Sequence, residues 1–117
     1  MRALETALRD ANAWYPSRGY VCWVMLDKKR PGVIISIDQL NRTALDVCVV
    51  PTTHVHHGEF PMRIELNEAD GMPERCWVKC DQVTTVLKLD VKSVITKLPE
   101  EKFRQIQDKV KLCLGLK

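Results

Sequence analysis

The sequence predicts a mainly β fold with helices, in which short strands form a small barrel and an amphipathic helix follows them. Three observations lead to this α+β class. Short apolar runs rich in β-branched and aromatic residues recur along the chain, turn residues separate them at close spacing, and residues 99–115 show helical spacing instead. The chain has 117 residues and 45% of them are hydrophobic, so we expect one domain, residues 1–117.

Seven runs are predicted as strands, because β-branched and aromatic side chains favour the pleated surface of a sheet. They are residues 20–26, 32–37, 45–50, 60–66, 76–80, 83–87 and 93–97. The connection between the first two is short enough for a hairpin. Residues 83–87 are expected to continue the preceding strand after a bend, and one helical turn is expected between Ile37 and Thr43.

Helices are predicted at both ends of the chain. Residues 1–12 carry apolar side chains at helical spacing, and Pro16 is expected to stop that helix. The last helix is clearer, because Pro99 suits its first turn, acidic residues follow at its start and Gly115 ends it. Its apolar residues are expected on one face: Phe103, Ile106, Val110, Cys113 and Leu114.

The overall charge permits a nucleic-acid partner without requiring one, because the formal net charge is +3. No apolar stretch approaches the roughly 18–20 residues that span a bilayer, and the start lacks a signal-peptide core. We therefore expect a cytoplasmic protein with no membrane partner. Five cysteines lie mostly in apolar runs, where reduced thiols act as small hydrophobic residues: Cys22, Cys48, Cys76, Cys80 and Cys113.

The stretch from Lys28 to Thr53 concentrates the polar residues of interest. Arg30 precedes one apolar run, and Thr52 and Thr53 follow the next one. Two buried strands would therefore present an arginine at the start of one and hydroxyl groups at the end of the other.

The same stretch carries motifs of a known family. Arg18-Gly19 leads to Trp23, Arg30-Pro31 leads into a Val-Ile-Ile-Ser strand, and Asn41-Arg42, Val-Val-Pro51, Gly71-Met72, Asp81-Gln82 and Leu114-Gly115-Leu116 follow in order. Each piece alone is weak, but the ordered set from Arg18 to the carboxyl end resembles the MazF/PemK (Kid) family of type II toxin–antitoxin toxins. Residues 1–17 are an extra helical segment outside that pattern.

The resemblance implies an SH3-like barrel of the CcdB/MazF type that forms a homodimer. It also implies cleavage of single-stranded RNA at short sequence motifs, without a metal or other cofactor, to give 2′,3′-cyclic phosphate and 5′-hydroxyl ends. A cognate antitoxin is the expected protein partner, and it is expected to block the RNA groove.

The resemblance assigns the catalytic roles to Arg30 and Thr53. Arg30 matches the family's catalytic arginine, and Thr53 matches its threonine by distance from Pro51. Thr52 is the rival, because alternation along a strand sends the two hydroxyls to opposite faces.

Further residues are candidates for RNA contact. Lys28, Lys29 and Arg42 are expected to form a basic rim with Arg30. Asn41, Thr52, His54 and Gln82 are the further candidates for RNA contact, whereas Asp81 is expected to be structural. His54 stands beside the catalytic threonine but lies outside the motif, so a loop histidine without a catalytic role is favoured over an acid or base. Trp23 and Trp77 are possible stacking surfaces, although core packing is favoured for both.

The residues also offer two alternatives to a metal-independent nuclease, a zinc site and a non-catalytic binding module. The histidines of residues 54–57 with Cys76 and Cys80 suggest zinc, but their spacing fits no recognised finger, so no metal is expected. A non-catalytic binding module on the same barrel, either a CcdB-like gyrase binder or a decayed nuclease, is the alternative to the nuclease. Two departures from the family bear on specificity: Thr84 stands where an arginine is frequent, and the loop before Arg30 is short.

Overall fold

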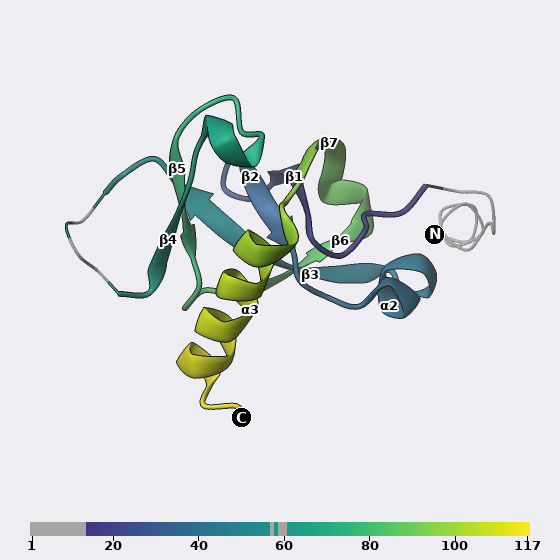
Figure 1. Cartoon of the computed structure of the whole chain (residues 1–117). Helices are drawn as coiled ribbons and strands as arrows, with labels where there is room; N and C mark the ends of the chain where they lie inside the picture. The colour runs from purple at the N-terminus through teal and green to yellow at the C-terminus, as the bar shows by residue number, and fades with distance from the viewer. Residues whose placement is uncertain (1–13, 57, 59–60) are drawn as a thin grey trace.

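The computed structural model describes residues 14–56, 58 and 61–117. Within these residues, seven strands and two helices follow one another, with short 3-10 turns at Glu68–Asp70 and Lys88–Asp90 (Figure 1). The elements are β1 (Tyr20–Met25), β2 (Lys29–Ile34), α2 (Asp38–Thr43), β3 (Asp46–Thr53), β4 (Arg63–Leu66), β5 (Cys76–Lys79), β6 (Thr84–Leu87), β7 (Val91–Lys97) and α3 (Glu100–Leu114). The helix expected at residues 1–12 lies outside the described residues.

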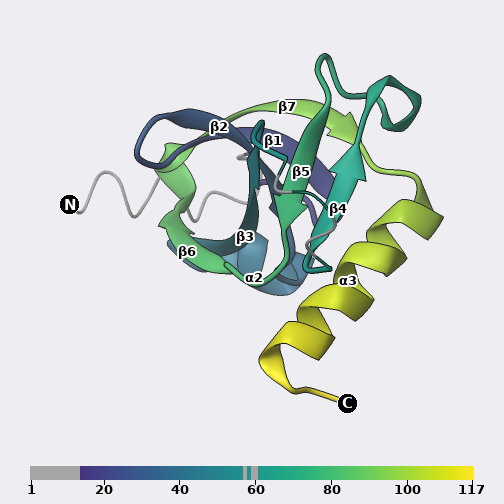
Figure 2. The same cartoon turned by 90° about the vertical axis from the view of Figure 1, so that its left-hand side faces the viewer.

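The strands form one antiparallel sheet that curls on itself, with α3 packed along one side (Figure 2). The strand order is β4-β5-β3-β2-β1-β7, and β6 lies beside β3. The expected hairpin is present, since β1 pairs with β2 from Val21↔Val33 to Met25↔Lys29. The predicted mainly β fold with a carboxyl-terminal helix is therefore confirmed, as a curled sheet whose hydrogen-bonded path ends at β4 and β7.

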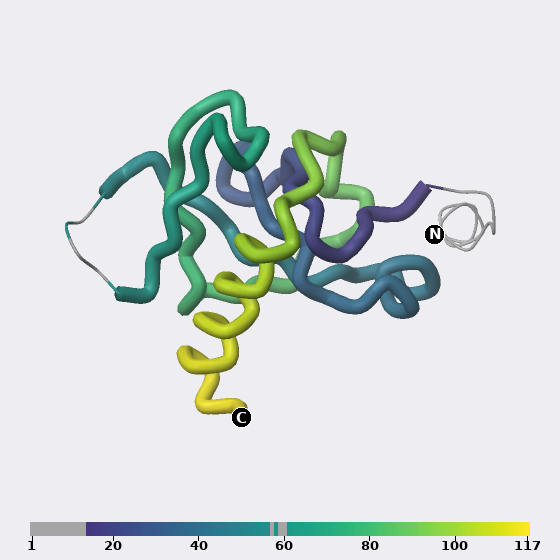
Figure 3. Tube along the Cα trace, in the orientation of Figure 1, coloured from purple at the N-terminus to yellow at the C-terminus, as the bar shows by residue number. Residues whose placement is uncertain are grey.

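The longest strand, β3, organises the sheet (Figure 3). One side of β3 pairs with β2. The other side pairs with β6 over Asp46–Val49 and with β5 at Thr52 and Thr53. Because β5 and β6 lie along the same side of β3, residues 83–87 do continue the previous strand after a bend, as the sequence predicts.

Strand alternation divides the core into two apolar clusters. On one face, residues such as Val21, Val33 and Val50 pack with Ile106 and Val110 of α3. On the other face, a second cluster contains Cys22, Val24, Ile34, Val47, Val49, Val86 and Val91. The sheet is thus covered on the first face by the helix and on the second by its own curling strands.

The helix α3 ends as expected but its apolar face is shorter than predicted. Gly115 adopts a left-handed conformation with φ +71°, and the amide of Leu116 donates to the carbonyl of Lys111 over 2.8 Å. The prediction that Leu114 belongs to the buried face is wrong, because its side chain is 53% exposed. Cys113 in the same turn still packs on the core, with its Sγ 2.9 Å from Sδ of Met62, so the buried part of this face ends at Cys113. The end of α3 extends past the sheet (Figure 1).

Three thiols are buried in the core, which confirms the interpretation of the cysteines as small hydrophobic residues. Burial raises the pKa of Cys22 and Cys76 to about 11 and that of Cys80 to about 12, so these thiols stay protonated near neutral pH. Within the described residues, no three His, Cys, Asp or Glu side chains gather as a metal site. No described helix is long and apolar enough to cross a membrane.

Candidate active site

The pairing of β2 with β3 brings Arg30 and Thr53 to one face of the sheet. Gly32 lies opposite Pro51 in this antiparallel pair. Continuing the register by two residues places Arg30 opposite Thr53, on the same face as Gly32 and Pro51. The start of one strand and the end of the next therefore meet at the same end of the pair.

The two adjacent threonines have different surroundings. Thr52 is 1% exposed, and its hydroxyl donates to the carbonyl of Pro31 over 2.8 Å. Thr53 is partly exposed, and its hydroxyl oxygen accepts a hydrogen bond of 3.1 Å from the amide of Val55. This contact uses a lone pair of Thr53 and leaves its proton free to be donated to a ligand. The Thr52 hydroxyl is instead buried and satisfied.

Arg30 forms a two-pronged ion pair that the sequence analysis missed. Its Nε lies 3.0 Å from Oδ1 of Asp27 and its Nη2 lies 3.1 Å from Oδ2. The hydrogen bond from Arg30, followed by one from the Lys28 backbone, lowers the pKa of Asp27 to about 2. The same pair raises the pKa of Arg30. A guanidinium fork can hold two oxygens of a phosphate in the same geometry as two oxygens of a carboxylate.

Beyond Thr53, the row of side chains continues across the sheet. Thr53 lies opposite Trp77, and Trp77 lies opposite Glu65. We call Arg30, Thr53, Trp77 and Glu65 the cross-strand row. The His56 ring stacks on Trp77 with centroids 4.7 Å apart and planes 12° apart, and the Arg75 guanidinium lies 4.8 Å from the indole centroid.

The expected basic rim is only partly assembled. Lys28 and Lys29 are exposed at the β1–β2 turn beside Arg30, and the Lys29 ammonium lies 5.5 Å from the Trp23 ring. Arg42 does not join them, because α2 connects the opposite ends of β2 and β3. Its guanidinium lies over Tyr15, 5.5 Å from the ring centroid.

Asn41 is a buried structural residue rather than a surface contact. Its side chain is fully buried, its amide donates to the Ser36 carbonyl over 2.9 Å and to Asp38 over 3.3 Å, and its oxygen accepts from the Ser36 hydroxyl. With these bonds in place it has no access to RNA, so we leave Asn41 out of the proposed RNA surface.

Gln82 is exposed but lies away from the cross-strand row. It lies in the bend between β5 and β6, where its backbone N–H donates to the Lys79 carbonyl over 3.0 Å. It follows Trp77 by five positions and lies past the end of β5, so it is not a member of the cross-strand row. The neighbouring Asp81 pairs with Arg63 across 3.3 Å, which fits the structural role expected of it.

His54 lines a cleft of about 170 Å³ next to the site, together with Trp23, Pro31, Met72, Pro73 and Glu74. Its Nε2 lies 3.1 Å from a carboxylate oxygen of Glu74. Trp23 and Pro31 are paired residues that face away from Arg30. His54 therefore engages Glu74 in this cleft rather than the Thr53 hydroxyl.

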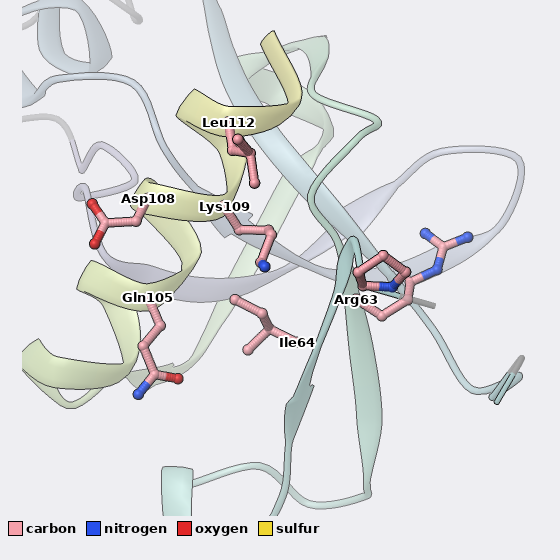
Figure 4. Close-up of a pocket in the computed structure, with 7 residues that line it drawn as sticks. Arg63, Ile64, Gln105, Asp108, Lys109 and Leu112 are labelled. Atoms are coloured by element: carbon pink, nitrogen blue, oxygen red, sulfur yellow. The ribbon is translucent and has the colours of Figure 1, made fainter. Parts of the chain in front are cut away.

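A larger cleft of about 470 Å³ lies between β4 and α3 (Figure 4). Side chains of Ile64 and Lys109 meet across it, and the exposed Leu112 forms part of its wall. It contains none of the predicted catalytic or RNA-contacting residues, so it is a surface separate from the cross-strand row.

Comparison with known protein families gives a match over residues 17–114, to the model of the PemK-like, MazF-like toxins of type II toxin–antitoxin systems. The chain belongs to this family. Compared with curated protein sequences, it shows no significant match.

Solved structures of MazF proteins share the fold. The Mycobacterium tuberculosis toxin MazF-mt6 is 20% identical, with a TM-score of 0.76, over 84% of this chain and 98% of that one. An endoribonuclease from a mycobacterial species is 23% identical, with a TM-score of 0.77, over 88% of this chain and 94% of its own. The MazE–MazF complex from Deinococcus radiodurans (Form-III) contains a chain that is 18% identical, with a TM-score of 0.75, over 89% and 100%.

Proposed function

We propose that this PemK/MazF toxin is a metal-independent endoribonuclease. It cuts single-stranded RNA, and Arg30 and Thr53 are its catalytic residues. The observation that carries the proposal is the register of β2 with β3, which when continued by two residues places Arg30 opposite Thr53 on one face. The guanidinium of Arg30 there holds two oxygens of a carboxylate. A purely adhesive surface has no need for a fork of donors beside a hydroxyl that can donate a proton.

The proposed reaction uses the RNA's own nucleophile. The ribose 2′-oxygen attacks the adjacent phosphorus, the bond to the 5′-oxygen breaks, and the products carry a 2′,3′-cyclic phosphate and a 5′-hydroxyl. The proton lost from the 2′-hydroxyl is balanced by one gained at the 5′-oxygen, so no water is consumed. Arg30 and Thr53 donate to the non-bridging oxygens, where negative charge grows in the transition state.

Arg30 acts through charge in this scheme rather than as a base. A guanidinium stays protonated in proteins, and its pairing with Asp27 raises its pKa further. The planar fork can follow two oxygens as the phosphorus changes geometry, which a lysine ammonium does less well. Lys28 and Lys29 extend the positive surface along the RNA backbone.

The protein partners follow from the relatives. One similar structure is an endoribonuclease from a mycobacterial species in complex with its cognate antitoxin, and others are MazE–MazF complexes. We propose that this chain forms a homodimer held inactive by an antitoxin of its own. The exposed Leu112, Leu114 and Leu116 at the end of α3 provide apolar surface for these contacts.

The test is incubation of the purified protein with a long single-stranded RNA in excess EDTA, followed by analysis of the product ends. We expect cyclic-phosphate and 5′-hydroxyl ends from the wild type, formed much more slowly by Arg30→Ala and Thr53→Val. Arg104→Ala is the matched control, because that arginine is exposed on α3 and pairs only with Glu101 among the described ion pairs. Intact RNA with a folded wild type would instead support the non-catalytic binding module.

A further inference from the structure

Trp77 is a buried hydrophobic residue that is not a member of either apolar cluster described above. Its side chain is 8% exposed. The indole lies in the cross-strand row between Thr53 and Glu65. Two polar side chains, His56 and Arg75, cover it where a core tryptophan would meet apolar neighbours.

Both covering groups are flat and lie against the ring. The His56 imidazole is nearly parallel to the indole, at 12° and 4.7 Å between centroids. The Arg75 guanidinium is planar as well and lies 4.8 Å from the centroid. A nucleobase is a flat aromatic ring of the same kind, so the surface that accepts His56 has the shape and chemistry to accept a base.

Both covering groups lie at the surface of the protein. His56 is exposed and belongs to the segment that leaves the sheet after β3. Arg75 is 58% exposed, and its ion pair with Glu65 spans 3.4 Å at the surface. Exposed pairs of this type contribute little, so a ligand can replace either group at small cost.

The position of Trp77 ties it to the proposed site of cleavage. Residues directly opposite on antiparallel strands have their Cβ atoms about 4.5–5.5 Å apart, and Trp77 is directly opposite Thr53. A nucleotide whose phosphate contacts Arg30 and Thr53 is therefore close enough to place its base, or that of its neighbour, on the indole.

We propose that Trp77 is a stacking platform for a base that flanks the scissile phosphate, and that the His56 ring occupies this platform until RNA displaces it. This inference rests on the proposed nuclease function. Stacking accepts every base, so the platform contributes affinity and alignment of the phosphate rather than sequence selection.

The test measures binding, so that it does not depend on cleavage. The probe is a labelled 12-nucleotide RNA with 2′-O-methyl riboses, centred on the cut site mapped with the long RNA, or oligouridine if no cut is found. Single abasic nucleotides are placed at each position in turn. Fluorescence anisotropy gives the dissociation constants for the wild type, Trp77→Leu, Trp77→Phe and Trp23→Leu, and thermal melting checks that each variant folds.

We expect one abasic position to weaken wild-type binding by about tenfold, the size typical of one base on an aromatic ring. The same position should change binding by Trp77→Leu less than twofold, while Trp77→Phe and Trp23→Leu keep most of the penalty. A penalty equal in Trp77→Leu and wild type, a penalty lost in Trp23→Leu instead, or no penalty at any position would each overturn the proposal. If Trp77→Leu does not fold, two other variants decide. The proposal expects His56→Ala to bind RNA at least as tightly as the wild type and Trp77→Phe to keep most of the abasic penalty, and weaker binding by His56→Ala would overturn it.

The two experiments distinguish failure of the nuclease proposal from failure of the stacking proposal. Intact long RNA in EDTA would refute the nuclease, whereas an abasic penalty on oligouridine that depends on Trp77 would still support the platform. Cyclic-phosphate products together with an abasic penalty unchanged in Trp77→Leu would support the nuclease and refute the platform.

Discussion

At one end of the β2–β3 pair, Ser36 and Asp38 form hydrogen bonds with the buried side-chain amide of Asn41. At the other end, Arg30 and Thr53 are partly exposed, and within the described part of the chain the guanidinium of Arg30 is hydrogen-bonded to the exposed Asp27. Both ends look equally polar in the sequence. The comparison shows that burial separates residues that hold the fold from residues available to a substrate.

The largest expected effect comes from removing the donor fork at the exposed end. Arg30→Ala should lower the cleavage rate by about 10²- to 10³-fold, as for other single donors that stabilise a transition state. Its stability should stay within about 0.5 kcal/mol of wild type, because the side chain makes only a surface ion pair. Single-turnover cleavage with denaturant unfolding measures both. A variant that cuts normally, or one that unfolds, would reverse the assignment.

Substitution of the buried Asn41 should lower stability and leave cleavage unchanged, the reverse of the result expected for Arg30. Asn41→Ala removes three buried hydrogen bonds and should cost about 2 kcal/mol of stability, or about 8 °C in Tm, with cleavage per folded molecule unchanged. Thermal unfolding beside the exposed control Gln39→Ala gives the comparison. A loss of cleavage by the folded variant would return Asn41 to the RNA surface.

The adjacent threonines also differ in burial, since Thr52 is buried and Thr53 is partly exposed. Thr53→Val should slow cleavage by about tenfold or more with little change in stability, because its hydroxyl faces the site. Thr52→Val should cost about 1 kcal/mol of stability and leave cleavage intact, because it deprives the Pro31 carbonyl of its donor. Reversed results would mean that the register at the end of β3 is shifted by one residue.

The smallest expected effect concerns Asp27, which competes with phosphate for Arg30. Asp27→Asn should tighten binding of an uncleavable RNA by a few-fold. The pKa of Asp27 is lowered to about 2, so its carboxylate stays charged above about pH 4 and the competition is lost only as the pH falls toward 2. The gain in affinity should therefore be the same at pH 5.5 and pH 8. Weaker binding by the variant would assign Asp27 a positive role in positioning.

Much of this fold is readable from the sequence, because its signals are local. The β1–β2 hairpin follows from two β-rich runs across a short turn, and Gly115 ends α3 through a local conformation. Leu114 was placed wrongly because helical spacing says nothing about where the supporting sheet stops. The prediction for residues 1–12 stays a prediction, since it lies outside the described residues.

The candidate site is less predictable, because it depends on pairing between distant segments. The motif order points to Arg30 and Thr53, and two successive antiparallel strands bring the start of one to the end of the other. That same geometry sends Arg42 to the far end, so closeness in sequence was misleading there. The place of Trp77 beside Thr53 needs the register of β3 with β5, which no local pattern encodes.

The most direct test of the joint action of Arg30 and Thr53 on one phosphate is a double-mutant cycle. Single-turnover cleavage in EDTA is measured for wild type, Arg30→Ala, Thr53→Val and the double variant, with thermal melting to confirm folding. Groups that act as a unit are not additive, so we expect the double variant to be about as slow as the slower single variant. Losses that multiply in the double variant, or a double variant that cuts at the wild-type rate, would contradict the account.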